Sequence, residues 1–464
     1  MKKPIRVLGC LLAMSLILSS CKNSEETTTK RDDTTQTTAE TTSVETTTEK
    51  TEAPTTTTEE TTTEATTTTE ATTTTEATTT EETTTVATTS SEETTAASSE
   101  ETSETSGSEK ESSETSSSSR VAAFDKDKAD KFMSGVTFEG AALVSQNREV
   151  VWTRAEGMAD REKNVPNTMD TVFEFGSITK QFTAVAIMQL VEKGLISPED
   201  TLDKYLPEYS HAKEITIHQL LNMTSGIPDY LETGTLGFSM MDFKNIDFSK
   251  LDVLEQTVRE VVSTPITGDW MVEQISAMDL MFTPGTEFYY CNTNYYFLGM
   301  IIEKLSGMKY DEYIRKNILE PLDLKDLYPD IDHLTSKGRT SLLFWNFDFP
   351  SQDPSISYAV GVMTGTAEGL LQWEYDVLDG KLLTKESWDK IFDGGAFGYG
   401  YGFYVKGNCL EHSGMTLGYN TNVFVDRENE TVIIVLSNIQ TLGMSLVQPM
   451  SSEISQYLQQ NCMG

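Results

Sequence analysis

The sequence predicts an α+β domain in which one antiparallel sheet is built from both ends of the domain and is flanked by helices. Short runs of β-branched and apolar residues at 141–153 and 402–436 indicate strands near the two ends, with helical patterns between them. Residues 22–120 contain no aromatic side chain, so the core has to come from the chain that follows them. We therefore expect one folded domain at 121–464.

Residues 1–21 have the pattern of a signal peptide. Three basic residues among the first six precede an apolar run at 7–18. About a dozen apolar residues are too few to cross a bilayer as a permanent helix. The closing Leu-Ser-Ser-Cys resembles the lipobox of bacterial lipoproteins, which implies cleavage before Cys21 and lipidation of its sulfur. The alternative is an ordinary secretory signal with an incidental cysteine. We expect Cys21 to anchor the chain on the extracytoplasmic face of the cell membrane.

Residues 22–120 form a predicted stalk between this anchor and the domain. The segment contains 41 Thr and 15 Ser, and 6 basic side chains against 23 acidic ones. So few apolar side chains cannot bury enough surface to offset the entropy lost on ordering. We therefore expect the segment to be disordered.

The charge of the whole chain excludes one class of function. With 35 Lys and Arg against 72 Asp and Glu, the net charge is −37, whereas nucleic-acid binding through basic patches needs clustered cations. The four histidines lack metal-ligand spacing, so we expect neither a metal nor another cofactor. Five cysteines are too few for a disulfide scaffold, and whether Cys409 and Cys462 pair stays open.

Within 121–464 the elements follow one another with clear boundaries. A hairpin is predicted at 141–153 and a short strand at 172–175. The run 181–193 is apolar on nearly every face and ends at Gly194, which predicts a helix buried on all sides. Further helices are predicted at 214–223, 251–262, 295–306, 310–318 and 367–378, and strands at 402–405, 409–412, 421–425 and 431–436.

The first of three chemical motifs is Ser177-Ile178-Thr179-Lys180. Five Ser-x-x-Lys matches occur in the chain, but only this one joins a strand and a glycine to a buried helix. Ser177 and Lys180 then share a face of the first helical turn, where free N–H groups favour a developing oxyanion. Burial should lower the proton affinity of Lys180, so that it can accept the serine proton. The alternative is a helix-capping Ser177 with Lys180 extended to solvent.

The second motif is Tyr290-Cys291-Asn292, which lies between a Pro-Gly turn and the helix predicted at 295–306. A phenol beside an ammonium should have a lowered pKa and can carry protons between nucleophile and leaving group. The Asn292 amide can donate to a substrate carbonyl. The alternative is a loop tyrosine that fills a gap next to an Asx turn.

The third motif is His412-Ser413-Gly414 on a predicted strand. Gly414 would let the backbone of a ligand approach closely. The N–H of the next residue, Met415, could act with that of Ser177 as a second oxyanion donor. The alternative for a lone histidine is a hydrogen-bonded structural role.

In this order the three motifs resemble those of the penicillin-recognising serine hydrolases. The likeness covers nearly all of 135–440 and is closest to the branch of class C β-lactamases and D-alanyl-D-alanine carboxypeptidases, often described as β-lactamase-related serine hydrolases. It implies an all-helical lobe beside the sheet, with the site between them. Supporting stretches are 173–183, 215–228, 284–299 and 361–373.

The resemblance also implies roles for the motif residues. Ser177 would be the acyl-accepting nucleophile, Lys180 its proton partner and Tyr290 the general base or proton relay. Asn292 would orient the substrate, and the strand from His412 to Met415 would bind it. His412 stands where class C β-lactamases have a lysine near the substrate carboxylate, which weakens the case for antibiotic hydrolysis. We expect this imidazole to titrate near neutrality and to hold a carboxylate when protonated.

These features predict a lipid-anchored, extracytoplasmic serine hydrolase that acts through an acyl-enzyme. Candidate substrates are D-alanyl peptides or esters of the cell envelope, small esters, and β-lactams. One alternative is a catalytically weak penicillin- or peptidoglycan-binding sensor that stays acylated. Another is an adhesin presented by the stalk. We expect contact with the membrane through the anchor and none with nucleic acid. Residues 229–280 match no pattern, and the oligomeric state stays open.

Overall fold

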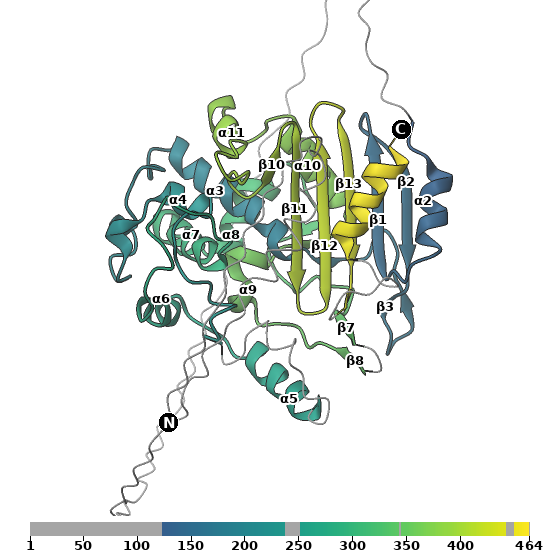
Figure 1. Cartoon of the computed structure of the whole chain (residues 1–464), viewed down its shortest axis with the longest axis horizontal. Coiled ribbons are helices and arrows are strands. Elements are labelled where there is room, and N and C mark those ends of the chain that lie inside the picture. Colours follow the sequence, from purple (N-terminus) through teal and green to yellow (C-terminus); the bar gives the residue numbers. More distant parts are fainter. Residues whose placement is uncertain (1–122, 237–250, 343–344, 442–449, 464) are drawn as a thin grey trace, which may run out of the picture. The chain divides into compact units, whose positions relative to one another are not determined.

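The computed structural model of the protein describes residues 123–236, 251–342, 345–441 and 450–463. The predicted signal peptide and stalk, and part of 229–280, lie outside these residues (Figure 1). No helix in the described part of the chain is long and apolar enough to cross a membrane.

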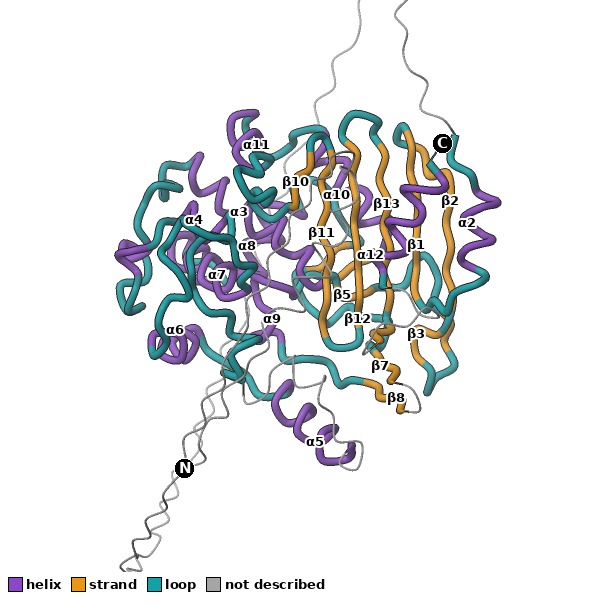
Figure 2. The backbone as a smooth tube through the Cα atoms, viewed as in Figure 1, coloured by secondary structure: helices purple, strands orange, loops and turns teal. Residues whose placement is uncertain are grey.

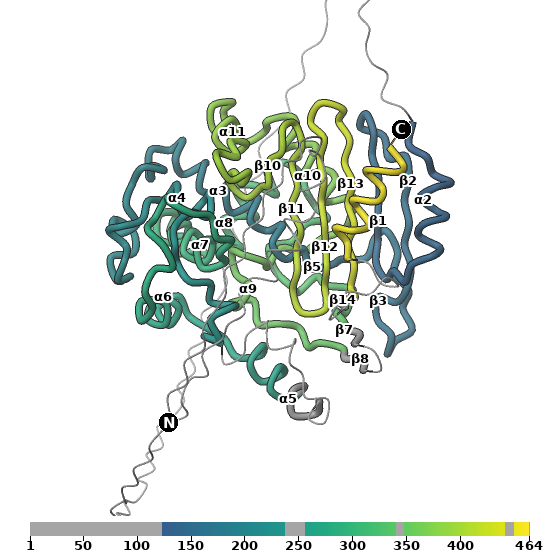
Figure 3. The backbone as a smooth tube through the Cα atoms, in the orientation of Figure 1, coloured from purple at the N-terminus to yellow at the C-terminus, as the bar shows by residue number. Residues whose placement is uncertain are grey.

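A six-stranded antiparallel sheet forms the centre of the domain, in the order β10-β11-β12-β13-β1-β2. The pairing of β1 with β13 joins the two ends of the domain, because Leu143 of β1 lies opposite Ile434 of β13. Figure 3 shows these early and late segments side by side. The prediction of a sheet built from both ends is confirmed. Its strands are β1 (Gly140–Gln146), β2 (Glu149–Glu156), β10 (Tyr404–Lys406), β11 (Cys409–Thr416), β12 (Tyr419–Asp426) and β13 (Thr431–Ser437).

Alternation along β1 explains why both faces of the sheet are covered. Ala141 and Leu143 point into the larger core, whereas Ala142 and Val144 point into a second, smaller one. The second core lies under two terminal helices, of which the C-terminal one packs on β12 and β13 (Figure 1). These helices are α2 (Lys126–Met133) and α12 (Ser451–Tyr457), the latter continued by a π-helical turn at Leu458–Cys462.

The larger core joins the other face of the sheet to a group of helices beside β10 and β11 (Figure 2). Its central element is α3 (Thr179–Glu192), in which the residues from Thr179 to Leu190 are all buried, as predicted. The other helices are α4 (Ile217–Leu221), α5 (Leu251–Val262), α6 (Gly268–Ser276), α7 (Asn292–Ser306), α8 (Tyr310–Ile314) with a π-helical turn at Arg315–Leu319, α9 (Pro354–Gly361), α10 (Ala367–Leu378) and α11 (Lys385–Ile391).

Several short elements were not predicted, because they carry little periodic signal. Helix α2 is mostly charged and buries only Ala129 and Met133. Two of the three small sheets include segments that are distant in sequence, so no local pattern marks their pairing, and the third is a short local pair. Of the strands in these sheets, only Phe173–Glu174 falls within a predicted strand, the one at 172–175. Their strands are β3 (Met158–Asp160), β4 (Val165–Pro166), β5 (Phe173–Glu174), β6 (Leu327–Tyr328), β7 (Arg339–Leu342), β8 (Trp345–Asp348), β9 (Thr364–Gly365) and β14 (Ile439–Thr441).

The described cysteines do not form a disulfide. Cys291, Cys409 and Cys462 are all free thiols, so Cys409 and Cys462 do not pair. Tertiary packing, without a covalent cross-link, holds the two ends of the described domain together.

Candidate active site

Ser177 lies in a tight turn between β5 and α3. Strand β5 is held by β9, and one 3₁₀ turn at Gly176–Ile178 then leads into the helix. Gly176 has φ +57°, and a Cβ there would lie 2.7 Å from the backbone N of Met415. Both the dihedral and the lack of space require glycine. Ser177 caps neither helical element, because Phe175 and Ile178 occupy the N-cap positions.

Lys180 is fully buried and points at the serine. Its Nζ donates to Ser177 Oγ at 3.0 Å, to Asn292 Oδ1 at 2.8 Å and to the Val360 carbonyl at 3.0 Å. Burial lowers the pKa of Lys180 to about 7. The alternative in which this side chain reaches solvent is therefore wrong. A buried amine that titrates near neutrality can accept the serine proton.

Tyr290 lies beside this pair, with Lys180 Nζ 5.1 Å from the centre of its ring. Its hydroxyl is buried and has no hydrogen-bond partner among the described residues. Burial raises the pKa of Tyr290 well above its usual value, and the neighbouring Ser177 hydroxyl offsets this only in part. The expectation of a lowered phenol pKa is wrong, because desolvation is the dominant effect. Tyr290 therefore faces the site as a neutral phenol that can still pass a proton on.

Asn292, the first residue of α7, connects Lys180 to an aspartate that the sequence analysis missed. Its backbone N and Nδ2 both donate to Asp229 Oδ2, at 2.8 and 2.7 Å. Its Oδ1 faces Lys180. The amide that was expected to orient substrate thus has partners within the protein at both ends. Asp229 could not be found from sequence, since a single aspartate after Pro228 belongs to no spacing pattern.

His412 does not have the environment that was expected. Its side chain is 1% exposed, and its Nε2 lies 3.1 Å from the Tyr399 hydroxyl. Its Nδ1 lies 2.7 Å from the Ser413 carbonyl, so the partners indicate a neutral ring protonated on Nδ1. Burial, and then the charge of Lys180, lower the pKa of His412 to about 3. The expectation that His412 titrates near neutrality is wrong, whereas its contact with a substrate carboxylate stays a prediction.

His412 is buried because the side chains of β11 alternate between a buried and an exposed face. Leu410, His412 and Gly414 point to the buried face, and the rings of Tyr290, Tyr399 and Tyr404 surround the imidazole at 5.5–6.0 Å. No carboxylate partner of His412 is recorded in the described part of the chain.

The rest of the third motif borders Ser177. A Cβ at Gly414 would lie 1.8 Å from the Phe175 carbonyl, so the space that was expected for a ligand is filled by the chain itself. Ser413 Oγ accepts a hydrogen bond from Asn422 Nδ2 at 3.0 Å. Met415 places its backbone N beside Gly176, next to Ser177, while its side chain is 44% exposed. This backbone position suits an oxyanion donor.

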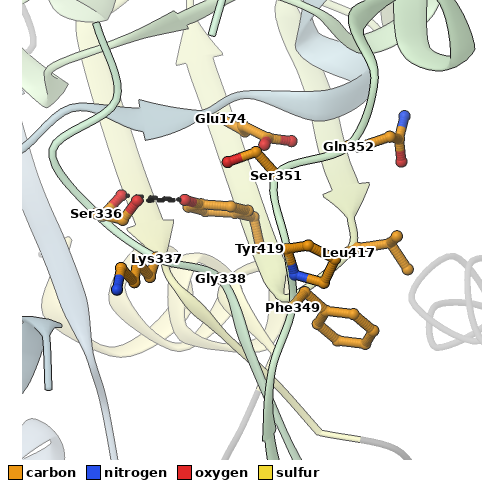
Figure 4. Close-up of a pocket in the computed structure, with 10 residues that line it drawn as sticks. Glu174, Ser336, Lys337, Gly338, Phe349, Ser351, Gln352, Leu417 and Tyr419 are labelled. Atoms are coloured by element: carbon orange, nitrogen blue, oxygen red, sulfur yellow. Dashed lines mark hydrogen bonds between the residues drawn. The ribbon is translucent and has the colours of Figure 1, made fainter. Parts of the chain in front are cut away.

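A small polar pocket opens at the end of the β11–β12 hairpin (Figure 4). Glu174 is the buried acid among its lining residues, and burial raises the pKa of this carboxyl to about 7. Tyr419 hydrogen-bonds Ser336 across the pocket. Glu174 was missed as well, although an acidic residue between Phe173 and Phe175 is a signal that sequence reasoning could have used.

A Ser–Lys pair at the start of a buried helix, packed against an antiparallel sheet, defines this protein as a serine hydrolase of the β-lactamase fold. The family model described as Beta-lactamase matches residues 126–448, and the chain belongs to that family.

The chain is similar to proteins that are named as penicillin-binding proteins, esterases and amidases. The chain is 28% identical over 324 residues to "Putative penicillin-binding protein PbpX" of Bacillus subtilis, with 68% of this chain and 74% of that protein covered. It is 28% identical over 217 residues to "Esterase EstB" of Burkholderia gladioli, with 44% and 49% covered. A solved structure of D-amino acid amidase from Ochrobactrum anthropi aligns with a TM-score of 0.58 and 21% identity, with 72% and 97% covered, which shows a shared fold.

Proposed function

We propose that the protein is a serine hydrolase that acts through an acyl-enzyme on Ser177 and prefers esters or amides whose leaving group carries no carboxylate. D-Alanyl esters of the cell envelope and small esters belong to this class. The observation that carries the proposal is the 3.0 Å contact between Ser177 Oγ and the buried Nζ of Lys180. Its second support is the neutral His412, which offers no cation to a substrate carboxylate.

The proposed steps follow from these positions. Neutral Lys180 takes the proton of Ser177 while Oγ attacks the substrate carbonyl carbon. The N–H groups of Ser177 and Met415 donate to the oxyanion that forms. When the tetrahedral intermediate collapses, the proton passes to the leaving oxygen or nitrogen, directly from Lys180 or through the phenol of Tyr290. Water then attacks the acyl-enzyme carbonyl and gives a proton to the same base. When this second tetrahedral intermediate collapses, the base returns the proton to Ser177 Oγ and the acid is released.

The relatives support this chemistry to different extents. EstB is named an esterase, and structures titled D-amino acid amidase and D-stereospecific amidohydrolase share the fold. PbpX is named as a putative penicillin-binding protein, which keeps D-alanyl peptides and β-lactams among the substrates to test. The neutral imidazole of His412 is the observation that favours uncharged esters over D-alanyl peptides and over β-lactams.

The deciding experiment compares turnover on four substrate types at pH 7.5. These are a p-nitrophenyl ester, a D-alanyl ester, a D-Ala-D-Ala peptide and nitrocefin, each tested with wild type and Ser177→Ala. We expect kcat/KM to be higher for both esters than for the two carboxylate-bearing substrates. Faster turnover of the peptide or nitrocefin would contradict the preference. A penicillin adduct on Ser177 that forms and does not turn over, with no ester hydrolysis, would point to the acylated sensor.

We also propose that the enzyme is lipid-anchored at Cys21 and carried on the stalk formed by residues 22–120. The support is the signal-like pattern of 1–21 and the composition of the stalk. In bacterial cells, Cys21→Ala should move the protein from the membrane fraction to the medium or periplasm, whereas a neighbouring substitution such as Lys22→Ala should not. Residues 121–464 alone should retain the ester kcat/KM of the full chain. An unchanged membrane fraction for Cys21→Ala would contradict the anchor.

A further inference from the structure

Asp229 is a buried carboxylate that fastens a loop of the helical part to the start of α7. Its side chain is 1% exposed, and its Oδ1 accepts from the N–H of Leu231 at 2.8 Å. Its Oδ2 accepts both N–H groups that Asn292 offers. The same loop is tied to α7 a second time, because Tyr230 N donates to Thr293 Oγ1 at 3.0 Å and that hydroxyl donates to the Pro228 carbonyl. The carboxylate is therefore held rigidly at the N-terminus of a 15-residue helix, where negative charge is favoured.

These contacts decide which way the Asn292 amide points. Carboxylate oxygens only accept hydrogen bonds, so the NH₂ group of Asn292 has to face Asp229. The amide oxygen is thereby turned to Lys180 Nζ, 2.8 Å away. Without Asp229, the amide would be free to turn its NH₂ group toward the lysine, where donor would meet donor. The position of the Lys180 amine beside Ser177 thus depends on a residue that touches neither of them directly.

Asp229 also places a negative charge near the Lys180 amine. The groups that face Lys180 from the elements around it are Tyr290, Cys291 and Tyr295 from α7 and the turn before it, and His412 from β11. Burial raises the pKa of the Cys291 thiol and of both phenols and lowers that of His412, so all four are neutral at pH 7. Among the described carboxylates, Asp229 is the one whose charge raises the pKa of Lys180 against the effect of burial.

Asp229 has its own neighbours. Glu232, on the same loop, repels its charge, whereas the hydrogen bonds from Asn292 and Leu231 stabilise it. Burial outweighs these bonds and raises the pKa of Asp229 to about 6. The carboxylate is therefore ionised in the pH range in which Lys180 titrates.

We propose that Asp229 is a positioning residue of the catalytic centre, which orients the Asn292 amide toward Lys180 and acts as the buried counter-charge of its ammonium. The inference rests on the proposed role of Ser177 and Lys180 and adds the group that sets the position and protonation of the lysine. No sequence motif points to Asp229, because it lies 49 residues after Lys180 and 63 before Asn292.

The test separates the two roles by two substitutions in the full-length protein. Asp229→Asn removes the charge but keeps an oxygen that can accept from Asn292, and Asp229→Ala removes both. The readout is the rate at which a fluorophosphonate phosphonylates Ser177 between pH 5 and 9, a reaction that forms the P–O bond, expels fluoride and needs the serine proton to be taken up. Glu232→Gln is the matched control, since it removes a carboxylate from the same loop without touching Asn292.

The labelling rate should fall at low pH as Lys180 becomes protonated, and this fall is the acid limb of the profile. For Asp229→Asn we expect the acid limb to move to lower pH by about one unit, because the negative charge that raised the pKa of Lys180 is gone. Its rate at pH 9 should stay within about tenfold of wild type, since orientation is largely kept. For Asp229→Ala we expect a loss of about tenfold or more at every pH. Glu232→Gln should follow the wild-type profile.

An acid limb that does not move in a folded Asp229→Asn variant would overturn the proposal, as would Glu232→Gln shifting it equally. If Asp229→Ala fails to fold, the Asn variant still decides. This test can fail independently of the proposed function. A wild-type protein that is labelled at Ser177 but hydrolyses no ester would contradict the proposed function, and the pH dependence of its labelling rate could still be measured.

Discussion

The Nζ of Lys180, on the first turn of the buried helix α3, lies 3.0 Å from the Oγ of Ser177 in the 3₁₀ turn before that helix. This contact sets the Ser-x-x-Lys match at Ser177 apart from the others, such as the one at Ser210, where the serine hydroxyl instead donates to the Ser276 carbonyl on the surface. Four predictions follow from this centre and its surroundings.

Ser177→Ala should abolish turnover and leave the fold intact, because the serine caps no helix and only its hydroxyl is lost. The expected loss in kcat is about 10³-fold or more, the scale for removal of a serine nucleophile. Ester hydrolysis and a thermal melt of the variant check this. Ser210→Ala and Ser306→Ala, which alter two of the other matches, are the controls and should keep wild-type activity. Residual activity of Ser177→Ala within about tenfold of wild type would exclude Ser177 as the nucleophile.

Tyr290→Phe should lower kcat by about 10²-fold or more, the usual contribution of a proton-transferring group, with KM little changed. The ring would keep its contacts with Tyr399 and Tyr404, so only the hydroxyl is tested. Tyr404→Phe removes a neighbouring hydroxyl from the same aromatic cluster and serves as the control. A normal kcat for Tyr290→Phe would leave Lys180 as the sole base.

His412 should stay neutral across the physiological range, because its pKa of about 3 lies far below it. The ratio of D-Ala-D-Ala peptide hydrolysis to neutral ester hydrolysis should therefore not change between pH 8 and 6. His412→Lys introduces an amine at this point and should raise the ratio. Measuring kcat/KM for both substrates across this range checks both statements. A wild-type ratio that rises as the pH falls would show that the imidazole is protonated in the site.

Glu374 on α10 should make the domain less stable as the pH rises. The side chain is completely buried, neither carboxylate oxygen has a hydrogen-bond partner in the described structure, and burial raises its pKa to about 8. In the unfolded chain the carboxyl loses its proton near pH 4.5, whereas in the folded state it keeps it. Between these two values the unfolded state binds fewer protons, so the free energy of unfolding falls by about 1.4 kcal/mol per pH unit from this group.

Glu374→Gln removes the titrating carboxyl and with it this pH-dependent loss of stability, so the variant should gain stability relative to wild type as the pH rises from 5 to 8. Urea unfolding at both pH values checks it. Glu174 and Asp229 also have raised pKa values and persist in the variant, so the difference between the two proteins isolates Glu374. Glu386→Gln, at a side chain that is 82% exposed, is the control. Equal pH dependence in Glu374→Gln and wild type would show that the buried carboxyl is ionised.

The sequence by itself determined the elements and residues whose signal is local. Apolar residues on every side of 181–193 marked the buried helix α3, and the position of Lys180 on its first turn already indicated a lysine with lowered proton affinity. Strand patterns at both ends predicted the sheet, and the order of three motifs indicated the family. Each of these depends on neighbours along the chain or on burial shown by a periodic pattern.

Only the tertiary structure decided the state of the groups in the site. The neutral His412, the raised pKa of Tyr290 and the filled space at Gly414 all depend on side chains and carbonyls that folding brings in from distant segments. Asp229 reaches the centre through a loop that carries no pattern. Desolvation and hydrogen bonding act over a few ångströms in space, and no spacing along the chain records which residues will share those few ångströms.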